Sequence, residues 1–108
     1  MKLEDNLKLA KLVDTYGMLL TNKQFEIITS YLNDDLTLSE IADNVGISRQ
    51  AVNDSINQSV KSLNEYEQKL KLIEKEDKLL SKLNELSLYS NKNTLTDKIN
   101  EIIEIIRG

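Results

Sequence analysis

Residues 38–56 read LSEIADNVGISRQAVNDSI, and they hold the most specific structural pattern in the chain. Thr37, just before it, begins a Thr-Leu-Ser-Glu capping box in which Glu40 reaches back to the start of a short helix. Gly46 supplies the positive φ that a sharp turn needs, and Ser48 is a natural N-cap for the next helix. The stretch therefore predicts a helix, a tight turn and a second helix, which is the helix-turn-helix arrangement.

The apolar residues of this stretch have the spacing of a buried core. The first helix, expected over residues 38–44, carries Ala42 where the two helices cross, and only a small side chain fits there. The expected core of the motif consists of Ile41, Val45, Ile47, Val52 and Ile56. A plain pair of packed helices would bury the same residues and bind no nucleic acid, so the motif leaves that alternative open.

The segment before the motif carries two more helix signals. Residues 3–19 place apolar side chains at i, i+3, i+4 and i+7, which indicates an amphipathic helix that Gly17 could end. Its expected buried face consists of Leu9, Leu12, Val13 and Tyr16. Thr21 then opens a second capping box with Gln24. The helix that follows places on one stripe Phe25, Ile28 and Leu32.

Downstream of the motif the chain contains few helix-breaking residues. A helix is expected from Leu63 to Leu86. It is apolar on two sides, which is typical of a helix placed between other helices or shared with a partner chain. A loop is expected at residues 90–93, and Thr94 or Thr96 could cap a last amphipathic helix.

These signals predict an all-α protein with two parts. A helix-turn-helix domain is expected over residues 1–70 and a C-terminal helical extension over residues 71–108. The extension has two interpretations. It folds back and completes a single core, or it joins two copies into a homodimer, which would suit a palindromic DNA site.

Composition excludes most catalytic and metal chemistry. The 108 residues contain no cysteine and no histidine, so no disulfide and no Ser-His-Asp or Cys-His hydrolase can form. The three glycines are scattered and cannot build a phosphate-binding loop. We therefore expect no enzyme, no cofactor and no metal site. The N-terminal residues lack an apolar signal segment and no stretch reaches about 20 apolar residues, so we expect a cytoplasmic protein without membrane contact.

A series of short motifs carries a more specific resemblance. In chain order they are Leu20-Thr21-x-Lys23-Gln24, Asp34-Asp35, Leu38-Ser39-Glu40-Ile41-Ala42, Ser48-Arg49-Gln50-Ala51-Val52, Asp54-x-Ile56 and Tyr66-Glu67-x-Lys69-Leu70. The series resembles the YlxM family of small helix-turn-helix proteins of Gram-positive bacteria. The motif itself is similar to the promoter-reading fourth region of sigma factors, within the winged-helix-like DNA-binding superfamily. The resemblance is specific over residues 16–70, and it implies a regulator linked to the signal recognition particle pathway of protein secretion.

The second helix of the motif has side chains suited to reading DNA. Arginine pairs with guanine in the major groove, and asparagine or glutamine pairs with adenine. A serine hydroxyl at a helix N-terminus can hold a phosphate, as can nearby lysines. The candidate nucleic-acid-binding residues are Ser48, Arg49, Gln50, Asn53, Asn57, Lys61 and Lys23. The chain departs from the family pattern at Asn53, where the family carries an aromatic residue, and near Asn57 and Gln58, where it carries basic ones.

The charge distribution favours a second interpretation. Residues 21–70 carry four cations and eight acids, which accounts for the whole net charge of −4. Because non-specific DNA affinity comes from cations that neutralise phosphates, so acidic a module should bind duplex DNA weakly as a monomer. The alternative is a protein-interaction module that binds the signal recognition particle GTPase, or the RNA of that particle, without specific DNA recognition.

Overall fold

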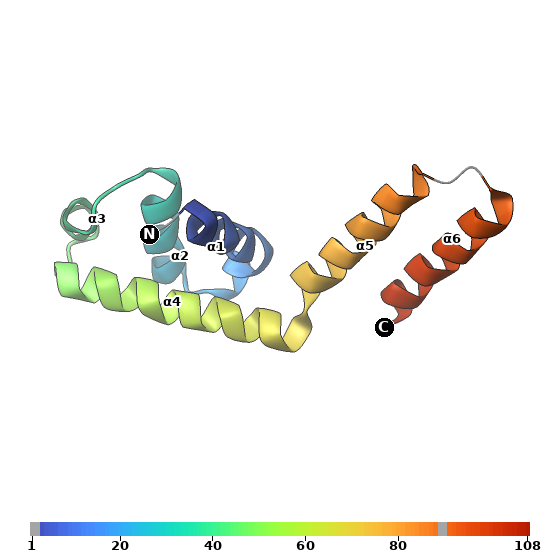
Figure 1. Cartoon of the computed structure of the whole chain (residues 1–108). Helices are drawn as coiled ribbons and strands as arrows, with labels where there is room; N and C mark the ends of the chain where they lie inside the picture. Colours follow the sequence, from blue (N-terminus) through green and yellow to red (C-terminus); the bar gives the residue numbers. More distant parts are fainter. Residues whose placement is uncertain (1–2, 89–90) are drawn as a thin grey trace. The chain divides into compact units, whose positions relative to one another are not determined.

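A computed structural model describes residues 3–88 and 91–108 of the chain (Figure 1). Within these residues it contains helices and no strand, which confirms the predicted all-α class. The elements are α1 (Leu3–Tyr16), the 3-10 turn η1 (Gly17–Leu19), α2 (Asn22–Asn33), α3 (Leu38–Val45), α4 (Arg49–Leu70), α5 (Leu72–Leu86) and α6 (Lys92–Arg107). They form two compact units, Met1–Leu70 (unit 1) and Lys71–Gly108 (unit 2).

In unit 1, three helices pack on one long helix. Figure 1 shows α3 at the beginning of α4, with α2 and then α1 further along it. Both capping boxes form. The Gln24 N–H donates to Thr21 Oγ1 at 3.2 Å, and the Glu40 N–H donates to Thr37 Oγ1 at 3.1 Å. In each box the side chain of the third helical residue, Gln24 or Glu40, accepts the N–H of the cap threonine in return, so the starts of α2 and α3 are set by contacts within four residues.

The helix-turn-helix motif is confirmed between α3 and α4. Gly46 has φ 79° and ψ 34°, which is the left-handed conformation that glycine adopts at little cost. The Ala42 carbonyl accepts the N–H of Gly46 at 2.9 Å and that of Ile47 at 3.2 Å. The fully buried centre consists of Ile27, Ile41, Ala42, Val52 and Ile56, and Val45 and Ile47 are partly buried against it. The tight turn therefore joins two helices through a continuous apolar contact.

The first helix is buried along the predicted face. Leu9, Leu12, Val13 and Tyr16 are all buried. The Tyr16 hydroxyl donates to Glu67 Oε1 at 2.5 Å, and its ring lies 6.1 Å from that of Tyr66. These contacts hold the end of α1 against the last third of α4. The α-helix ends at Tyr16, as Gly17 predicted, although the chain continues as a 3-10 turn.

The predicted stripe of α2 was partly wrong. Ile28 is fully buried, but Phe25 is 42% exposed, and the buried neighbour on α2 is Ile27. The reason is the close approach of Phe25 to Gly17. A Cβ built on Gly17 would lie 2.9 Å from Phe25 Cε2, so the ring rests on the bare glycine backbone at the surface instead of entering the core.

The predicted helix from Leu63 to Leu86 was also wrong. The second motif helix runs on without a break to Leu70, and Lys71, with φ 55°, then separates α4 from α5. Because an L residue adopts the left-handed region at a cost, Lys71 interrupts a sequence that would otherwise propagate as helix.

The start of the last helix differs from the prediction as well. Its cap is Asn91, whose Oδ1 accepts the N–H of Asn93 at 2.9 Å and of Thr94 at 3.4 Å, and neither Thr94 nor Thr96 is the cap. Lys92 and Asn93, expected in a loop, belong to α6, and Ser90 lies outside the described residues. Asparagine is among the best N-cap residues, so the earlier position prevails.

We expect Gly46→Ala to lower the free energy of unfolding by about 1–2 kcal/mol, the cost of a left-handed conformation for an L residue. No atom lies within 4 Å of the added Cβ, so the cost is that of the backbone alone. Urea unfolding of the full chain measures it. Asn44→Ala, at an exposed position of α3, is the control and should change stability by less than about 0.5 kcal/mol. Equal stability of Gly46→Ala and the native chain would contradict this account of the turn.

Candidate nucleic-acid interface

The first half of α4 carries an exposed polar stripe. Val52 and Ile56 of this helix are buried in the motif core. The exposed side chains before, between and after these two residues are Arg49, Gln50, Asp54, Asn57, Gln58 and Lys61. Because an α-helix turns about 100° per residue, positions 50, 54, 57 and 61 follow one line along the surface. The packing of α4 on α2 and α3 therefore turns this stripe away from the core.

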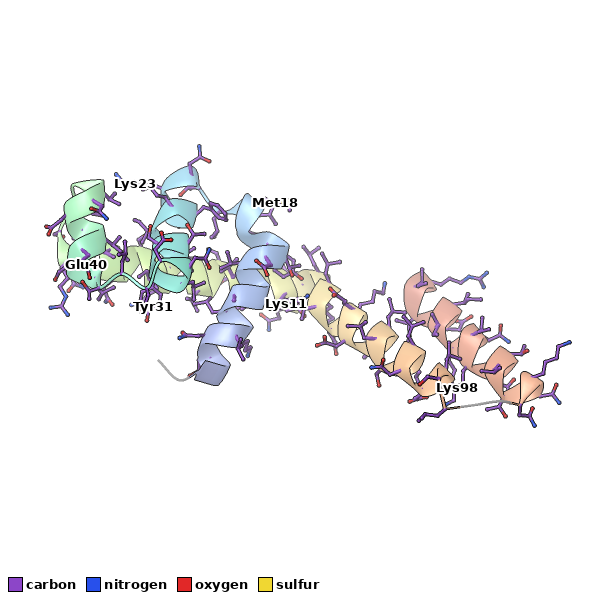
Figure 2. The ribbon with its side chains drawn as sticks, turned by 90° about the horizontal axis from the view of Figure 1, so that it is seen from above. Lys11, Met18, Lys23, Tyr31, Glu40 and Lys98 are labelled. Atoms are coloured by element: carbon purple, nitrogen blue, oxygen red, sulfur yellow. The ribbon has the colours of Figure 1, made fainter. Side chains whose placement is uncertain are left out.

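The predicted site residues fall into two groups. Six of them lie just before α4, at Ser48, or on α4 between Arg49 and Lys61. The seventh, Lys23, is exposed in the first turn of α2, on a different helix (Figure 2). Lys61 is exposed at the far end of the stripe. The fold thus brings most of the predicted residues onto one continuous surface, and the role of each stays a prediction.

Ser48 caps the helix that carries the stripe. Its Oγ accepts the N–H of Ala51 at 3.0 Å, and its carbonyl accepts the N–H of Val52 at 3.1 Å. The first four N–H groups of a helix have no partner within the helix, and this cap satisfies the third one. The backbone N–H groups of Arg49 and Gln50 also lie in the first turn of α4, where the helix dipole favours an anion.

Asp54 lies on the same stripe, and it is not among the residues predicted from the sequence to bind nucleic acid. Its Oδ1 accepts a hydrogen bond from Gln50 Nε2 at 2.9 Å. The bond orients the Gln50 amide along the helix and leaves its carbonyl oxygen and one N–H for another partner. It also places a carboxylate between Arg49 and Lys61. The four-residue spacing of Gln50 and Asp54 was the signal in the sequence, since such pairs meet on one helix face.

Asn53 does not stand out from the surface with its neighbours. It is half-buried and lines a shallow recess of about 240 Å3 together with Leu38, Arg49 and Gln50. The recess lies where the start of α3 meets the start of α4. Two polar side chains, a guanidinium and one leucine therefore line one small concave surface.

The helix beside the stripe is acidic. Glu40 and Asp43 of α3 are both exposed, and Glu40 is labelled in Figure 2. The Glu40 carboxylate accepts the Thr37 N–H at 3.2 Å as part of the capping box. The first helix of a helix-turn-helix crosses the DNA backbone when the second enters the groove. Two carboxylates on α3 therefore lower the affinity of this surface for phosphate.

Among the described residues, no three acidic side chains gather closely enough to hold a metal ion. None of the helices in residues 3–88 and 91–108 is both long enough and apolar enough to cross a membrane.

Comparison with known proteins identifies a family that is described as helix-turn-helix. Residues 3–105 match the family UPF0122, described as "Putative helix-turn-helix protein, YlxM / p13 like". A UPF0122 protein of Clostridium perfringens is 44% identical over 96 residues, which cover 89% of this chain and 86% of that protein. One of Shouchella clausii is 41% identical over 104 residues, 96% of this chain and 95% of that protein. One of Symbiobacterium thermophilum is 44% identical over 84 residues, 78% of each chain.

We expect Ser48→Ala to lower the free energy of unfolding by about 1 kcal/mol, because the Ala51 N–H loses its partner. Ser48→Asp keeps an acceptor at the cap and should stay within a few tenths of a kcal/mol of the native chain. Urea midpoints of the two variants decide the matter. An equal loss in both would show that packing of Ser48, and not capping, stabilises the start of α4.

Proposed function

The chain belongs to the UPF0122 family, and we propose that it is a cytoplasmic regulator that binds duplex DNA through α4. The observation that carries the proposal is the exposed polar stripe on the second helix of a helix-turn-helix motif. In such motifs the second helix enters the major groove and its first residues contact base edges. Here those residues are Arg49, Gln50 and Asn53, which lie together around the recess at the start of α4.

Each of the proposed contacts follows from side-chain chemistry. Arg49 donates two parallel hydrogen bonds to O6 and N7 of a guanine. Gln50 or Asn53 pairs with an adenine through its amide oxygen and N–H. Asn57 extends the same line one turn further along the groove. Ser48, Lys61 and Lys23 hold phosphates and position the helix, without reading sequence themselves.

The acidic charge of unit 1 shapes the binding that this surface can support. Only Arg49 and Lys61 are cations among residues 48–62, and Asp54 opposes them. Few counterions are released by so few cations, so non-specific affinity is low and its salt dependence shallow. Specific base contacts must then supply most of the binding free energy. We propose that two copies bind together, because a homodimer doubles the contacts and matches a palindromic site.

A second function is favoured by the same acidic charge. Unit 1 would serve as a protein-interaction module whose carboxylates, such as Glu40 and Asp43, pair with a basic partner surface. The candidate partner is the signal recognition particle GTPase, which the family resemblance implies. Binding to the RNA of that particle is the weaker form of this alternative, because unit 1 lacks a run of cations along one face.

We expect Arg49→Ala to weaken binding to the cognate duplex by about 1–3 kcal/mol, roughly five- to 150-fold, because a bidentate base contact is lost. Fluorescence anisotropy against the DNA upstream of the gene of this protein, and against a scrambled duplex, measures the change. Lys69→Ala removes the same charge from the exposed end of α4 and is the matched control. It should leave the affinity within about twofold of the native value, because a single exposed charge at that end of α4 is screened by salt.

The same titration separates the two functions. Binding of the native chain to the upstream duplex that Arg49→Ala reduces and Lys69→Ala leaves unchanged supports DNA reading. Binding to neither duplex at low salt rejects DNA reading and favours the interaction module. In that case the purified GTPase is the next ligand, and Glu40→Gln with Asp43→Asn should weaken its binding where Arg49→Ala does not.

We expect Lys61→Gln to weaken binding to both duplexes alike and to reduce the slope of log affinity against log salt by about 0.9, the value for one phosphate contact. Anisotropy titrations at four or more salt concentrations give the slope. Asn57→Ala, on the same stripe without a charge, should leave the slope unchanged. A slope that is the same in Lys61→Gln and the native chain would remove Lys61 from the phosphate-binding set.

A further inference from the structure

Unit 2 is a pair of antiparallel helices joined along one side by charges. Figure 1 shows α5 and α6 side by side. Lys82 Nζ lies 3.0 Å from Glu101 Oε2, and Lys98 Nζ lies 3.0 Å from Glu85 Oε2. Figure 2 places Lys98 of α6 on the side toward α5. The Lys82 ammonium, with Lys98 beside it, holds the pKa of the Glu101 carboxyl below its usual value. These four residues mark one face of the helix pair, the charged face.

The opposite face of the pair is apolar. Its side chains, 37–61% exposed, are Leu72, Leu80, Leu83, Ile99, Ile103 and Ile106. At about 100° per residue, the residues of α5 in this set lie on the side of the helix away from Lys82 and Glu85. The same holds for α6 relative to Lys98 and Glu101. Because the two helices are antiparallel, both stripes face the same way and form one surface, the hairpin face.

Two helices cannot bury this surface themselves. The side chains between them, such as Leu79, Ile102 and Ile105, are only half-buried, and no residue described in α5 or α6 is fully buried. An amphipathic element must cover its apolar side with another layer to be stable. Six large aliphatic side chains in one contiguous surface exceed the scattered apolar residues that a monomer normally exposes. The hairpin face therefore needs an occupant.

Charge and size favour a second copy of the chain as that occupant. Unit 2 carries seven cations and seven acids, so two copies meet without net repulsion, while unit 1 carries the whole net charge of −4. With 15 residues in α5, the face measures about 22 Å by 18 Å, or roughly 400 Å2 per copy. Side-chain relief raises the area buried by two copies toward the roughly 1,000 Å2 of a specific interface.

We propose that the hairpin face packs against the same face of a second copy, so that α5 and α6 of both chains form a four-helix bundle. The contact is isologous, with each chain giving the same residues. Leu80 and Ile103, which stand level with each other in the helix pair, lie at its centre. The inference rests on the proposed function for the use of the dimer on DNA, but self-association is measured without DNA.

Sedimentation velocity of the full chain, from about 1 µM to about 500 µM, tests the contact over the range in which a small interface associates. The native chain should shift from monomer to dimer as concentration rises. Leu80→Glu should stay monomeric throughout, because it places a carboxylate in the centre of the interface. Ser81→Glu adds the same charge at the neighbouring exposed position, outside the hairpin face, and should dimerise like the native chain.

Circular dichroism keeps the result interpretable. If Leu80→Glu loses helicity, Leu80→Ala replaces it, because alanine favours the helix and only removes apolar contact. Each dimer then loses two leucine side chains, so the dissociation constant of the dimer should rise at least about tenfold. Unchanged dimerisation of a helical Leu80→Glu or of Leu80→Ala would overturn the proposal.

Two outcomes identify other occupants and also overturn it. In the first, the native chain stays monomeric at every concentration, and the amides of α5 and α6 are as protected from hydrogen exchange as those of α4. The hairpin face is then covered within one chain. A monomer with unprotected α5 and α6 amides leaves the face open for a different protein. Dimerisation without DNA binding would contradict the proposed DNA reading alone. DNA binding by a strict monomer would contradict this inference and the paired binding proposed above, and it would leave DNA reading by α4 intact.

Discussion

The left-handed turn at Gly46 is the constraint on which the rest of unit 1 depends. It lets one carbonyl, that of Ala42, accept two successive N–H groups, and the chain passes from α3 to α4 in three residues. Because Ile41 and Val52 are fully buried on either side of the turn, core packing sets the rotation of α4 about its axis. The exposed stripe follows from that rotation. The surface proposed to read DNA is thus a consequence of how the core is filled.

The parts of the fold that were predicted from sequence depend on contacts within about four residues. The capping boxes at Thr21 and Thr37, the turn at Gly46 and the cap at Ser48 are of this kind, and all four form. The errors arose where distant groups compete. Phe25 stays at the surface because Gly17, in a separate turn, offers its ring a flat backbone contact, and periodicity within α2 contains no such information.

The break at Lys71 has a different cause. No glycine or proline marks it, and the apolar spacing continues across it, so periodicity predicts a single helix there. The exposure of the candidate interface residues was easier to predict, because exposure along α4 follows from which residues are buried. What the residue types alone did not supply was the coupling of Gln50 to Asp54 and the half-buried position of Asn53. Both depend on neighbours one helical turn away or on α3.

Separation of charge and apolar surface between the two units connects the two proposals. If unit 1 binds DNA through α4, its acidic charge weakens that binding, since repulsion from Glu40 and Asp43 opposes the proposed contacts of Arg49 and Lys61. If unit 2 joins two copies, the second unit 1 binds from a high effective concentration, and the weak affinities combine. The acidic charge lowers the affinity of both kinds of binding. It then suppresses the binding of a single copy to an arbitrary sequence more than the binding of two joined copies to two half-sites. A surface that is too acidic for a monomeric DNA-binding protein is, on this argument, suited to a dimeric one.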